Sequence, residues 1–157
     1  MKPRAYIETS VISYLTAKPS RDVIVVAHQQ LTREWWEGHR QRFELCSSQI
    51  LVEEASAGDP EAAQKRLAAS AELPVLDLTR DVADLANELV NRGVIPPKHI
   101  RDAFHIAAAT VHGMDYLVTW NCTHIANAEL RESVDAACRE RGYRLPIICT
   151  PEELMGV

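Results

Sequence analysis

The chain is poor in glycine, and it lacks the glycine-rich turns that bind phosphates and dinucleotides. It has 6 glycines in 157 residues, and no two of them are spaced for a G-x-G-x-x-G turn or a P-loop. It also contains no H-E-x-x-H and no G-x-S-x-G sequence. These absences argue against dinucleotide cofactors, nucleoside triphosphate hydrolysis, zinc proteolysis and esterase chemistry.

Paired cysteines and long hydrophobic runs are missing as well. The cysteines form no C-x-x-C pair and are Cys46, Cys122, Cys138 and Cys149. We expect them to be reduced and packed as small hydrophobic residues, rather than joined in disulfides or around zinc. No stretch has the length of a signal-peptide core or a membrane-spanning helix. The sequence therefore predicts a cytoplasmic protein that does not contact membranes.

The chain also lacks an excess of positive charge. Its net charge is −5 at pH 7, and its pI is about 5.7, which does not favour unspecific binding to nucleic acids. If the protein acts on a nucleic acid, a local basic patch has to hold it against an acidic background. The length suits one buried core, and we expect a single domain over residues 1–157.

Signals for strands and helices alternate along the chain. Apolar runs predict strands at residues 4–7, 42–47, 74–78, 116–119 and 147–149. Periodicity, caps and stops predict helices near residues 11–15, 22–38, 48–58, 81–92, 102–112 and 128–141, a further helix that begins at 59–61, and a closing turn at 151–154. No turn sequence typical of a β-hairpin joins two strands, so the pattern predicts an α/β domain with a mainly parallel sheet.

Two of the helix predictions depend on particular residues. Thr9 or Ser10 is expected to cap the first helix, and Asp22 the second. In the second helix, apolar residues recur every four positions and predict one buried face, made of Val23, Ala27, Leu31 and Trp35. Trp36 is turned by about 100° from Trp35, and we expect it at a protein contact or, alternatively, at the rim of the core.

Three acidic residues and one amide stand where the predicted elements begin or end. Glu8 directly follows the first strand, and Glu54 lies in the helix after the second strand. Asp102 is at the head of an alanine-rich helix, and Asn121 follows the fourth strand. Because sites in parallel sheets form outside the carboxyl ends of the strands, we expect these side chains to converge in one pocket.

Several carboxylates in one pocket need a compensating positive charge. Two unit charges about 4 Å apart repel by roughly 4 kcal/mol at an effective dielectric constant near 20, so the pocket would hold a proton or a cation. Oxygen ligands suit Mg²⁺ or Mn²⁺, which can assist phosphodiester hydrolysis. Simpler interpretations remain open: Asp102 as a helix N-terminal acid, and Glu54 as a solvated helix residue beside the more exposed Glu53.

Basic side chains around Asp102 are candidates for holding phosphate groups. Lys98, His99 and Arg101 flank this acid, and His124 comes shortly after the fourth strand. The alternative for the first three is a solvated loop. The alternative for His124 is a surface or structural role.

Hydroxyl groups and two further histidines complete the set of candidates. Thr9 or Ser10 could contact a water of a metal site, and helix capping alone is the alternative. His105 and His112 lie one heptad apart on the alanine-rich helix. We interpret both histidines as structural.

Four segments of the chain resemble the PIN-domain nucleases, a family that includes the VapC-like toxins of toxin–antitoxin pairs. The segments are residues 6–12, 48–54, 102–109 and 117–121. In the second segment, the spacing from Ser48 selects Glu54 rather than its neighbour. Glu8 stands where the family usually has aspartate, and Asn121 stands where many members have aspartate.

The resemblance implies a three-layer α/β/α sandwich and a metal-dependent endoribonuclease that acts on RNA. It implies that Glu8, Glu54 and Asp102 bind Mg²⁺ or Mn²⁺ and that Asn121 supports catalysis. It also implies a homodimer and an antitoxin that covers the active site. Two alternatives are a binding module of the same fold with too little charge to hold a catalytic metal, and a metal-dependent phosphatase.

Overall fold

A parallel β-sheet forms the centre of the molecule. The structure is a computed structural model, and it describes residues 1–156; the expected domain also includes residue 157, which lies outside them. The strands lie in the order β3-β2-β1-β4-β5, and every neighbouring pair is parallel. Their bounds are β1 Arg4–Ile7, β2 Glu44–Ser48, β3 Val75–Leu76, β4 Tyr116–Val118 and β5 Ile147–Cys149.

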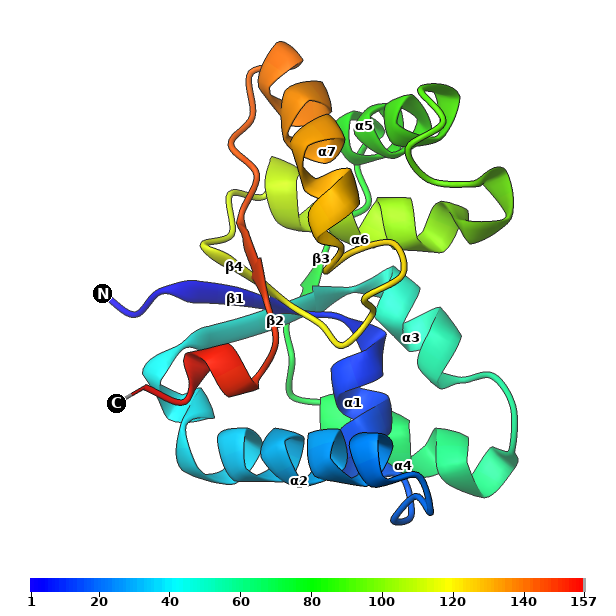
Figure 1. The fold of residues 1–157 in the computed structure, drawn as a ribbon, viewed down its shortest axis with the longest axis vertical. Helices are drawn as coiled ribbons and strands as arrows, with labels where there is room; N and C mark the ends of the chain where they lie inside the picture. The colour runs from blue at the N-terminus through cyan, green and yellow to red at the C-terminus, as the bar shows by residue number, and fades with distance from the viewer. Residues whose placement is uncertain (157) are drawn as a thin grey trace.

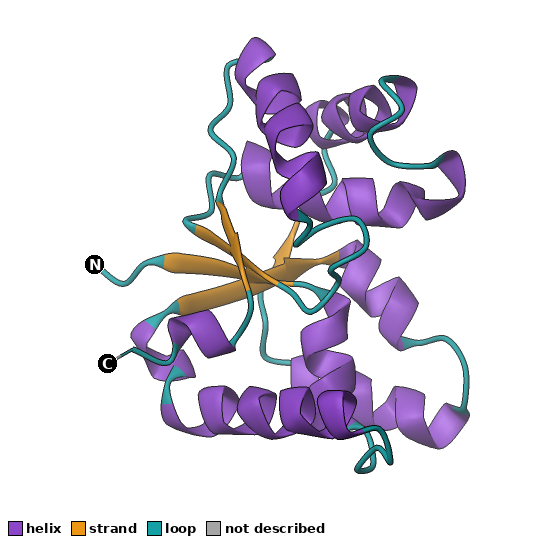
Figure 2. Ribbon diagram, viewed as in Figure 1, coloured by secondary structure: helices purple, strands orange, loops and turns teal. Residues whose placement is uncertain are grey.

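Helices cover both faces of this sheet, as Figures 1 and 2 show, so the predicted three-layer α/β/α sandwich is confirmed. On one face lie α1, α2 and α4, and on the other lie α5, α6 and α7, while α3 leads away from the end of β2. Their bounds are α1 Thr9–Thr16, α2 Val23–Gly38, α3 Gln49–Ala55, α4 Pro60–Ser70, α5 Arg80–Asn91, α6 Ile100–Val111 and α7 Ala128–Glu140.

Alternating side chains of the central strands supply the two halves of the core. In β1, Tyr6 packs with α5, α6 and α7, whereas Ala5 and Ile7 pack with the helices of the other face. In β4, Leu117 and Val118 divide in the same way. This alternation follows from the two-residue period of a strand, and a strand buried on both faces has to be apolar throughout. The position of Glu8, one residue beyond β1, therefore places a carboxylate at the edge of the core.

The capping prediction for α2 is confirmed, and the one for α1 is wrong. The Asp22 side chain accepts hydrogen bonds from the backbone N–H groups of Ile24 and Val25, at 2.9 and 3.0 Å. Ser48 caps α3. In contrast, α1 begins at Thr9, and its N-cap residue Glu8 makes no side-chain capping bond.

Several expected boundaries shift by a few residues. The second strand begins at Glu44 because residues Arg40–Arg42 form a 3₁₀ turn, and the third strand shrinks from residues 74–78 to Val75–Leu76. The helix expected at residues 102–112 starts at Ile100, directly after a second 3₁₀ turn at Pro97–His99. Asp102 is therefore in the first turn of α6 rather than at its first residue.

The predicted apolar face of α2 is wrong in its N-terminal half. Val23 is 77% exposed, whereas Trp35 is fully buried. The buried face of α2 also includes Gln29 and Thr32. At 3.6 residues per turn, positions four apart advance by about 40° around a helix, so Val23 and Trp35 are about 120° apart. A strict four-residue spacing therefore does not define one face.

Three of the cysteines are packed as expected. Cys46, Cys138 and Cys149 are buried, Cys122 is exposed, and all four are free thiols. Burial raises the pKa of the Cys46 and Cys138 thiols to about 11 and that of Cys149 to about 12. Within residues 1–156, no helix combines the length and apolar character that crossing a membrane requires.

Candidate functional site

Glu8 is a buried carboxylate at the carboxyl edge of the sheet. Glu8 directly follows β1, and its backbone N–H donates to the carbonyl of Val118 at 3.0 Å. Only 4% of the residue is exposed. Two hydroxyl groups donate to its Oε1 atom: that of Thr119, at 2.6 Å, and that of Ser10. These bonds compensate for burial of the charge, which is costly when no donor is present.

Glu54 reaches the same edge of the sheet from helix α3, and one of its ligand atoms lies within 4.8 Å of one from Glu8. Its Oε1 atom accepts a hydrogen bond from Thr9 Oγ1 at 2.7 Å and lies 2.6 Å from Nε2 of His105. Burial by itself raises the pKa of the Glu54 carboxyl, but the hydrogen bond and charge of His105 and the bond from Thr9 outweigh it, and the pKa lies below its ordinary value. The carboxylate is therefore held in its ionised form.

His105 connects this carboxylate to the core through a chain of hydrogen bonds. Its side chain is fully buried, and its Nδ1 atom lies 2.7 Å from the hydroxyl of Tyr6. The Tyr6 hydroxyl in turn lies 2.7 Å from Oγ of Ser48, the residue that caps α3. When Nε2 of His105 donates to Glu54, Tyr6 donates to Nδ1 and Ser48 donates to Tyr6, so every donor finds an acceptor. The network joins β1, β2, α3 and α6.

Glu8, Glu54 and His105 together form what we call the carboxylate cluster. One ligand atom from each residue lies within 4.8 Å of the others. The recorded hydrogen bonds all go to Oε1 of each glutamate, and within residues 1–156 no partner engages Oε2. Neither Oε2 atom is among the described polar atoms that are both fully buried and unpaired. Two such oxygens fit a hard divalent cation.

Asp102 lies in a second group, which we call the imidazole cluster: His99, Asp102 and His124. Oδ2 of Asp102 is 2.8 Å from Nδ1 of His124. An open pocket of about 470 Å³ borders this cluster, and it is lined by Pro96, Lys98, His99, Asp102, Asn121, Thr123 and His124. The three predicted acids are thus divided between two clusters rather than gathered in one. The clusters are neighbours, because Asp102 and His105 lie one turn apart on α6.

Asn121 lines the open pocket but uses its amide oxygen to organise the loop. Oδ1 accepts hydrogen bonds from the backbone N–H groups of Thr123 and His124, at 3.2 and 3.1 Å. The Asn121 N–H donates to Oγ1 of Thr119 at 2.9 Å. The residue therefore positions His124 opposite Asp102.

The basic candidates lie on the rim of the site. Lys98 lines the open pocket. Arg101, whose side chain is half exposed, lies 3.8 Å from the carboxylate of Glu53 and also lowers the pKa of Glu54 by its charge. Glu53 is exposed, as expected, whereas Glu54 faces the site. These cations are the local positive charge within an otherwise acidic chain.

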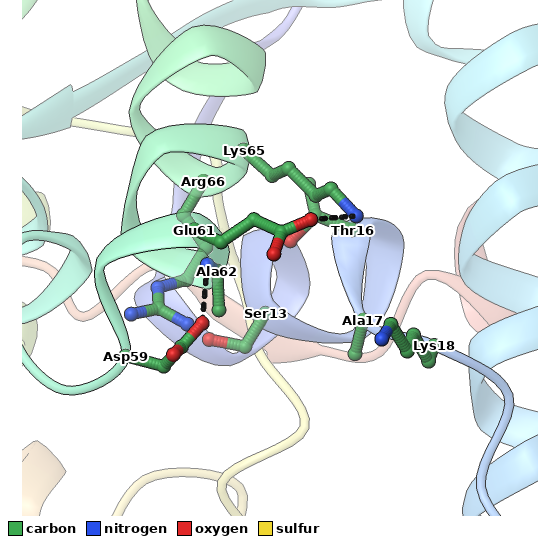
Figure 3. A pocket seen from close by; sticks show the side chains of 9 residues that line it. All are labelled: Ser13, Thr16, Ala17, Lys18, Asp59, Glu61, Ala62, Lys65 and Arg66. Atoms are coloured by element: carbon green, nitrogen blue, oxygen red, sulfur yellow. Dashed lines mark hydrogen bonds and ion pairs between the residues drawn. The ribbon is translucent and has the colours of Figure 1, made fainter.

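A second pocket, of about 300 Å³, is far from this chemistry. It lies between α1 and α4, and Figure 3 shows Asp59, Glu61 and Lys65 at its wall. Asp59 caps α4 by accepting from the N–H of Ala62 at 2.9 Å, and Lys65 lies 3.9 Å from Glu61. None of the lining residues of this pocket is a predicted site residue.

Sequence reasoning missed one member of the carboxylate cluster, His105, and two residues that bond to its members, Tyr6 and Thr119. His105 was interpreted as structural, yet it contacts Glu54 directly. Tyr6 and Thr119 were read only as strand residues. One signal was available for His105, since it follows Asp102 by one helical turn and so shares its side of the helix. Thr9 and Ser10 hold carboxylates instead of capping α1.

The comparisons with known proteins give a likeness of fold. No family model and no curated protein matches the chain. Among solved structures, VapBC2 from Rickettsia felis, bound to a DNA fragment from their promoter, matches with a TM-score of 0.52 and 15% identity, over 93% of this chain and 97% of that chain. The chain has a PIN-like fold.

A second solved structure resembles the PIN-like domain less closely. VapBC-5 from Mycobacterium tuberculosis, a member of the VapBC family of toxin–antitoxin systems, matches with a TM-score of 0.47 and 16% identity, over 79% of this chain and 90% of that chain. The expected PIN-like fold is confirmed by the R. felis comparison alone, and the chemistry of the PIN-like domain has to be argued from its own side chains.

Proposed function

We propose that this PIN-like domain is a Mg²⁺- or Mn²⁺-dependent endoribonuclease and the toxin of a toxin–antitoxin pair. The observation that carries the proposal is the carboxylate cluster. Glu8 and Glu54 come from separate segments, meet at the carboxyl edge of a parallel sheet, and each keep one carboxylate oxygen, Oε2, without a recorded partner among residues 1–156. Such an edge is where ligands of open α/β sheets bind.

The residues divide into those that would bind the cation and those that orient the binding groups. Glu8 and Glu54 would hold it through Oε2, and Asp102 would approach from the adjacent turn of α6. A divalent cation there would neutralise charge on a phosphodiester and activate water for attack. Hydrogen bonds to Oε1, donated by Thr9, Ser10, Thr119 and His105, fix both glutamates in place.

The rim of the site would bind the RNA backbone. Lys98 and Arg101 supply positive charge, and His124 lines the pocket between them and Asn121. Phosphate contacts of this kind are independent of sequence and weaken as salt increases. We propose that these residues align a phosphodiester with the carboxylate cluster, while Asn121 holds the loop that carries His124.

The protein partners are also part of the proposal. The R. felis structure is that of VapBC2 on promoter DNA, which supports an antitoxin partner for this chain. We propose in addition a homodimer, acting in the cytoplasm, with Trp36 in or near the contact. Trp36 is half-buried, and the Arg40 guanidinium lies 4.3 Å from its ring centroid. Light scattering tests the dimer, and a monomer at high micromolar concentration would remove it; unchanged self-association of Trp36→Ala would remove the anchor.

The decisive experiment replaces the two neighbouring glutamates of α3 one at a time. Glu54→Gln keeps the shape and removes the ligand charge, so RNA cleavage with Mn²⁺ should fall strongly. Glu53→Gln changes an exposed neighbour and should be nearly silent. An essential Glu53 beside a dispensable Glu54 would contradict the site. RNA binding without cleavage would favour a binding module, and turnover of small phosphate esters would favour a phosphatase.

A further inference from the structure

The imidazole cluster has the composition of a metal site of a different kind. The ligand atoms of His99, Asp102 and His124 all lie within 4.8 Å of one another. The side chains of His124 and Asp102 are only 12% and 13% exposed. The ring centroids of His99 and His124 are 4.4 Å apart. Two imidazoles and one carboxylate therefore converge on one wall of the open pocket.

The imidazole of His99 has ring nitrogens that are available as metal ligands. Among the described residues, His99 makes a ring contact with His124, but its ring nitrogens enter no hydrogen bond or ion pair. Nδ1 of His124 lies 2.8 Å from Oδ2 of Asp102, so these two atoms face the same space and can both bind one cation when Nδ1 carries no proton. A cation in the pocket would give these nitrogens a ligand role.

The backbone on both sides of the cluster is fixed before any ligand arrives. His99 ends the 3₁₀ turn Pro97–His99, and Pro96 and Pro97 restrict the chain that leads into it. On the other side, the Asn121 side chain holds the N–H of His124 at 3.1 Å. Ligands that are already ordered lose less entropy when they bind.

The donor set decides which cations fit. Imidazole suits Zn²⁺ and its neighbours, whereas carboxylate and water suit Mg²⁺ and Mn²⁺. Three protein ligands with an open fourth position is the arrangement of zinc sites that remain accessible to solvent. We propose that His99, Asp102 and His124 bind a divalent cation of the Zn²⁺ class, at a centre separate from the carboxylate cluster.

This centre does not depend on ribonuclease activity, but it has a consequence for it. Asp102 would be a ligand of the bound Zn²⁺ and could no longer serve a cation at the neighbouring glutamates. Zn²⁺ would therefore act against Mg²⁺ or Mn²⁺ in the proposed reaction. Because binding is measured directly, a catalytically inactive chain that binds Zn²⁺ would leave this inference intact.

The test is a Zn²⁺ titration of chelator-treated protein in millimolar Mg²⁺, followed by calorimetry. Mg²⁺ is present to occupy the carboxylate cluster. We expect one Zn²⁺ per chain, with affinity lowered by more than about tenfold in His99→Ala and in His124→Ala. The matched control His39→Ala removes a half-buried histidine at the end of α2 and should bind Zn²⁺ as the unmodified chain does. Glu54→Gln should also keep this affinity.

A second measurement covers variants that fold poorly. Co²⁺ in the unmodified chain should give visible absorption typical of imidazole ligands, which His99→Gln weakens while circular dichroism stays unchanged. No Zn²⁺ binding in Mg²⁺ would overturn the proposal. So would equal affinities in all histidine variants, or affinity that is lost in Glu54→Gln and kept in His99→Ala.

Discussion

The carboxylate cluster and the imidazole cluster lie one turn apart on α6, yet they are built in opposite ways. In the first, His105 is fully buried and Oε1 of each glutamate receives two hydrogen bonds. In the second, His99 and His124 come from loops beside an open pocket. The difference shows that ligand type and burial, rather than distance along the chain, decide which cation each cluster can hold.

The carboxylate cluster is bonded into the core of the domain, whereas the imidazole cluster lies at the edge of the core. Tyr6, Ser48 and His105 link Glu54 to two strands and a helix through bonds of 2.6 and 2.7 Å. Asp102 and His124 share a single bond of 2.8 Å. Changes in the carboxylate cluster should therefore alter stability as well as chemistry, and changes at His99 or His124 should alter metal binding with little change in stability.

The largest effect should come from Glu8→Gln. The hydroxyls of Ser10 and Thr119 can still donate to the amide oxygen, so the fold should survive while the ligand charge is lost. RNA cleavage in Mn²⁺ should fall by about a hundredfold or more, since cation stabilisation of the phosphodiester contributes several kcal/mol. Single-turnover cleavage of a labelled RNA measures this loss. His99→Ala should lower cleavage by less than about tenfold, and equal losses would erase the contrast between the clusters.

His105→Ala should destabilise the folded state by about 2–4 kcal/mol, because it removes one hydrogen-bond partner from Tyr6 and one from Glu54 and opens a cavity. Urea denaturation measures the free energy of unfolding. The matched variant is His124→Ala, which should cost less than about 1 kcal/mol beside the open pocket. If the two variants were equally destabilised, the imidazole cluster would be as much a part of the core as the carboxylate cluster.

Mn²⁺ should stabilise the unmodified chain through the carboxylate cluster. Binding to the folded state alone contributes about 2.7 kcal/mol at a concentration of about 100 times Kd. Thermal unfolding in millimolar Mn²⁺ should show a rise in Tm that Glu8→Gln removes and Glu53→Gln keeps. An absent shift, together with no calorimetric binding, would count against the cluster as a metal site.

Asn121→Asp should have a smaller effect, confined to the open pocket. An aspartate oxygen can accept the same N–H groups of Thr123 and His124, so the loop should keep its shape. The added charge should tighten Mn²⁺ or Zn²⁺ binding by roughly fivefold, or about 1 kcal/mol for a charge near the surface. Calorimetry measures the affinity for each cation, and an unchanged or weaker affinity would place residue 121 beyond the reach of the cation.

The smallest effect concerns the cysteine in the loop beside the imidazole cluster. In native protein near pH 8, iodoacetamide should label Cys122 first, because it is exposed and burial raises the pKa of the Cys46 and Cys138 thiols to about 11. Mass spectrometry identifies the labelled residue. Zn²⁺ should change the labelling rate and Mg²⁺ should not. Equal effects of both ions would mean that they share one site.

Local sequence predicted the parts of the site that local physics determines. An apolar run buried on both faces has to be a central strand, so the position of Glu8 at its end followed directly. The choice of Glu54 over Glu53 came from the family resemblance, through the spacing from Ser48. The fold class followed from the alternation of strands and helices.

The division into two clusters could not be predicted in the same way. It depends on how α6 crosses the sheet, which places His105 among the glutamates and turns Asp102 toward His124. The role of His105 depends on Tyr6 and Ser48, which are distant in sequence. The predicted apolar face of α2 was wrong in its N-terminal half for a simpler reason, because residues spaced four apart advance around a helix by about 40° at each step.

The pairing of β1 with β4 also determines how long Glu8 keeps its position. The N–H of Glu8 donates to Val118 as an extension of the pairing between β1 and β4, in the middle of the sheet. Such an amide exchanges its hydrogen with solvent only when the whole domain opens, whereas loops open locally and often. Hydrogen exchange at Glu8 should therefore report global unfolding, and exchange at Cys122 and Thr123 should be much faster. The Glu8 carboxylate would keep its position for as long as the domain itself remains folded.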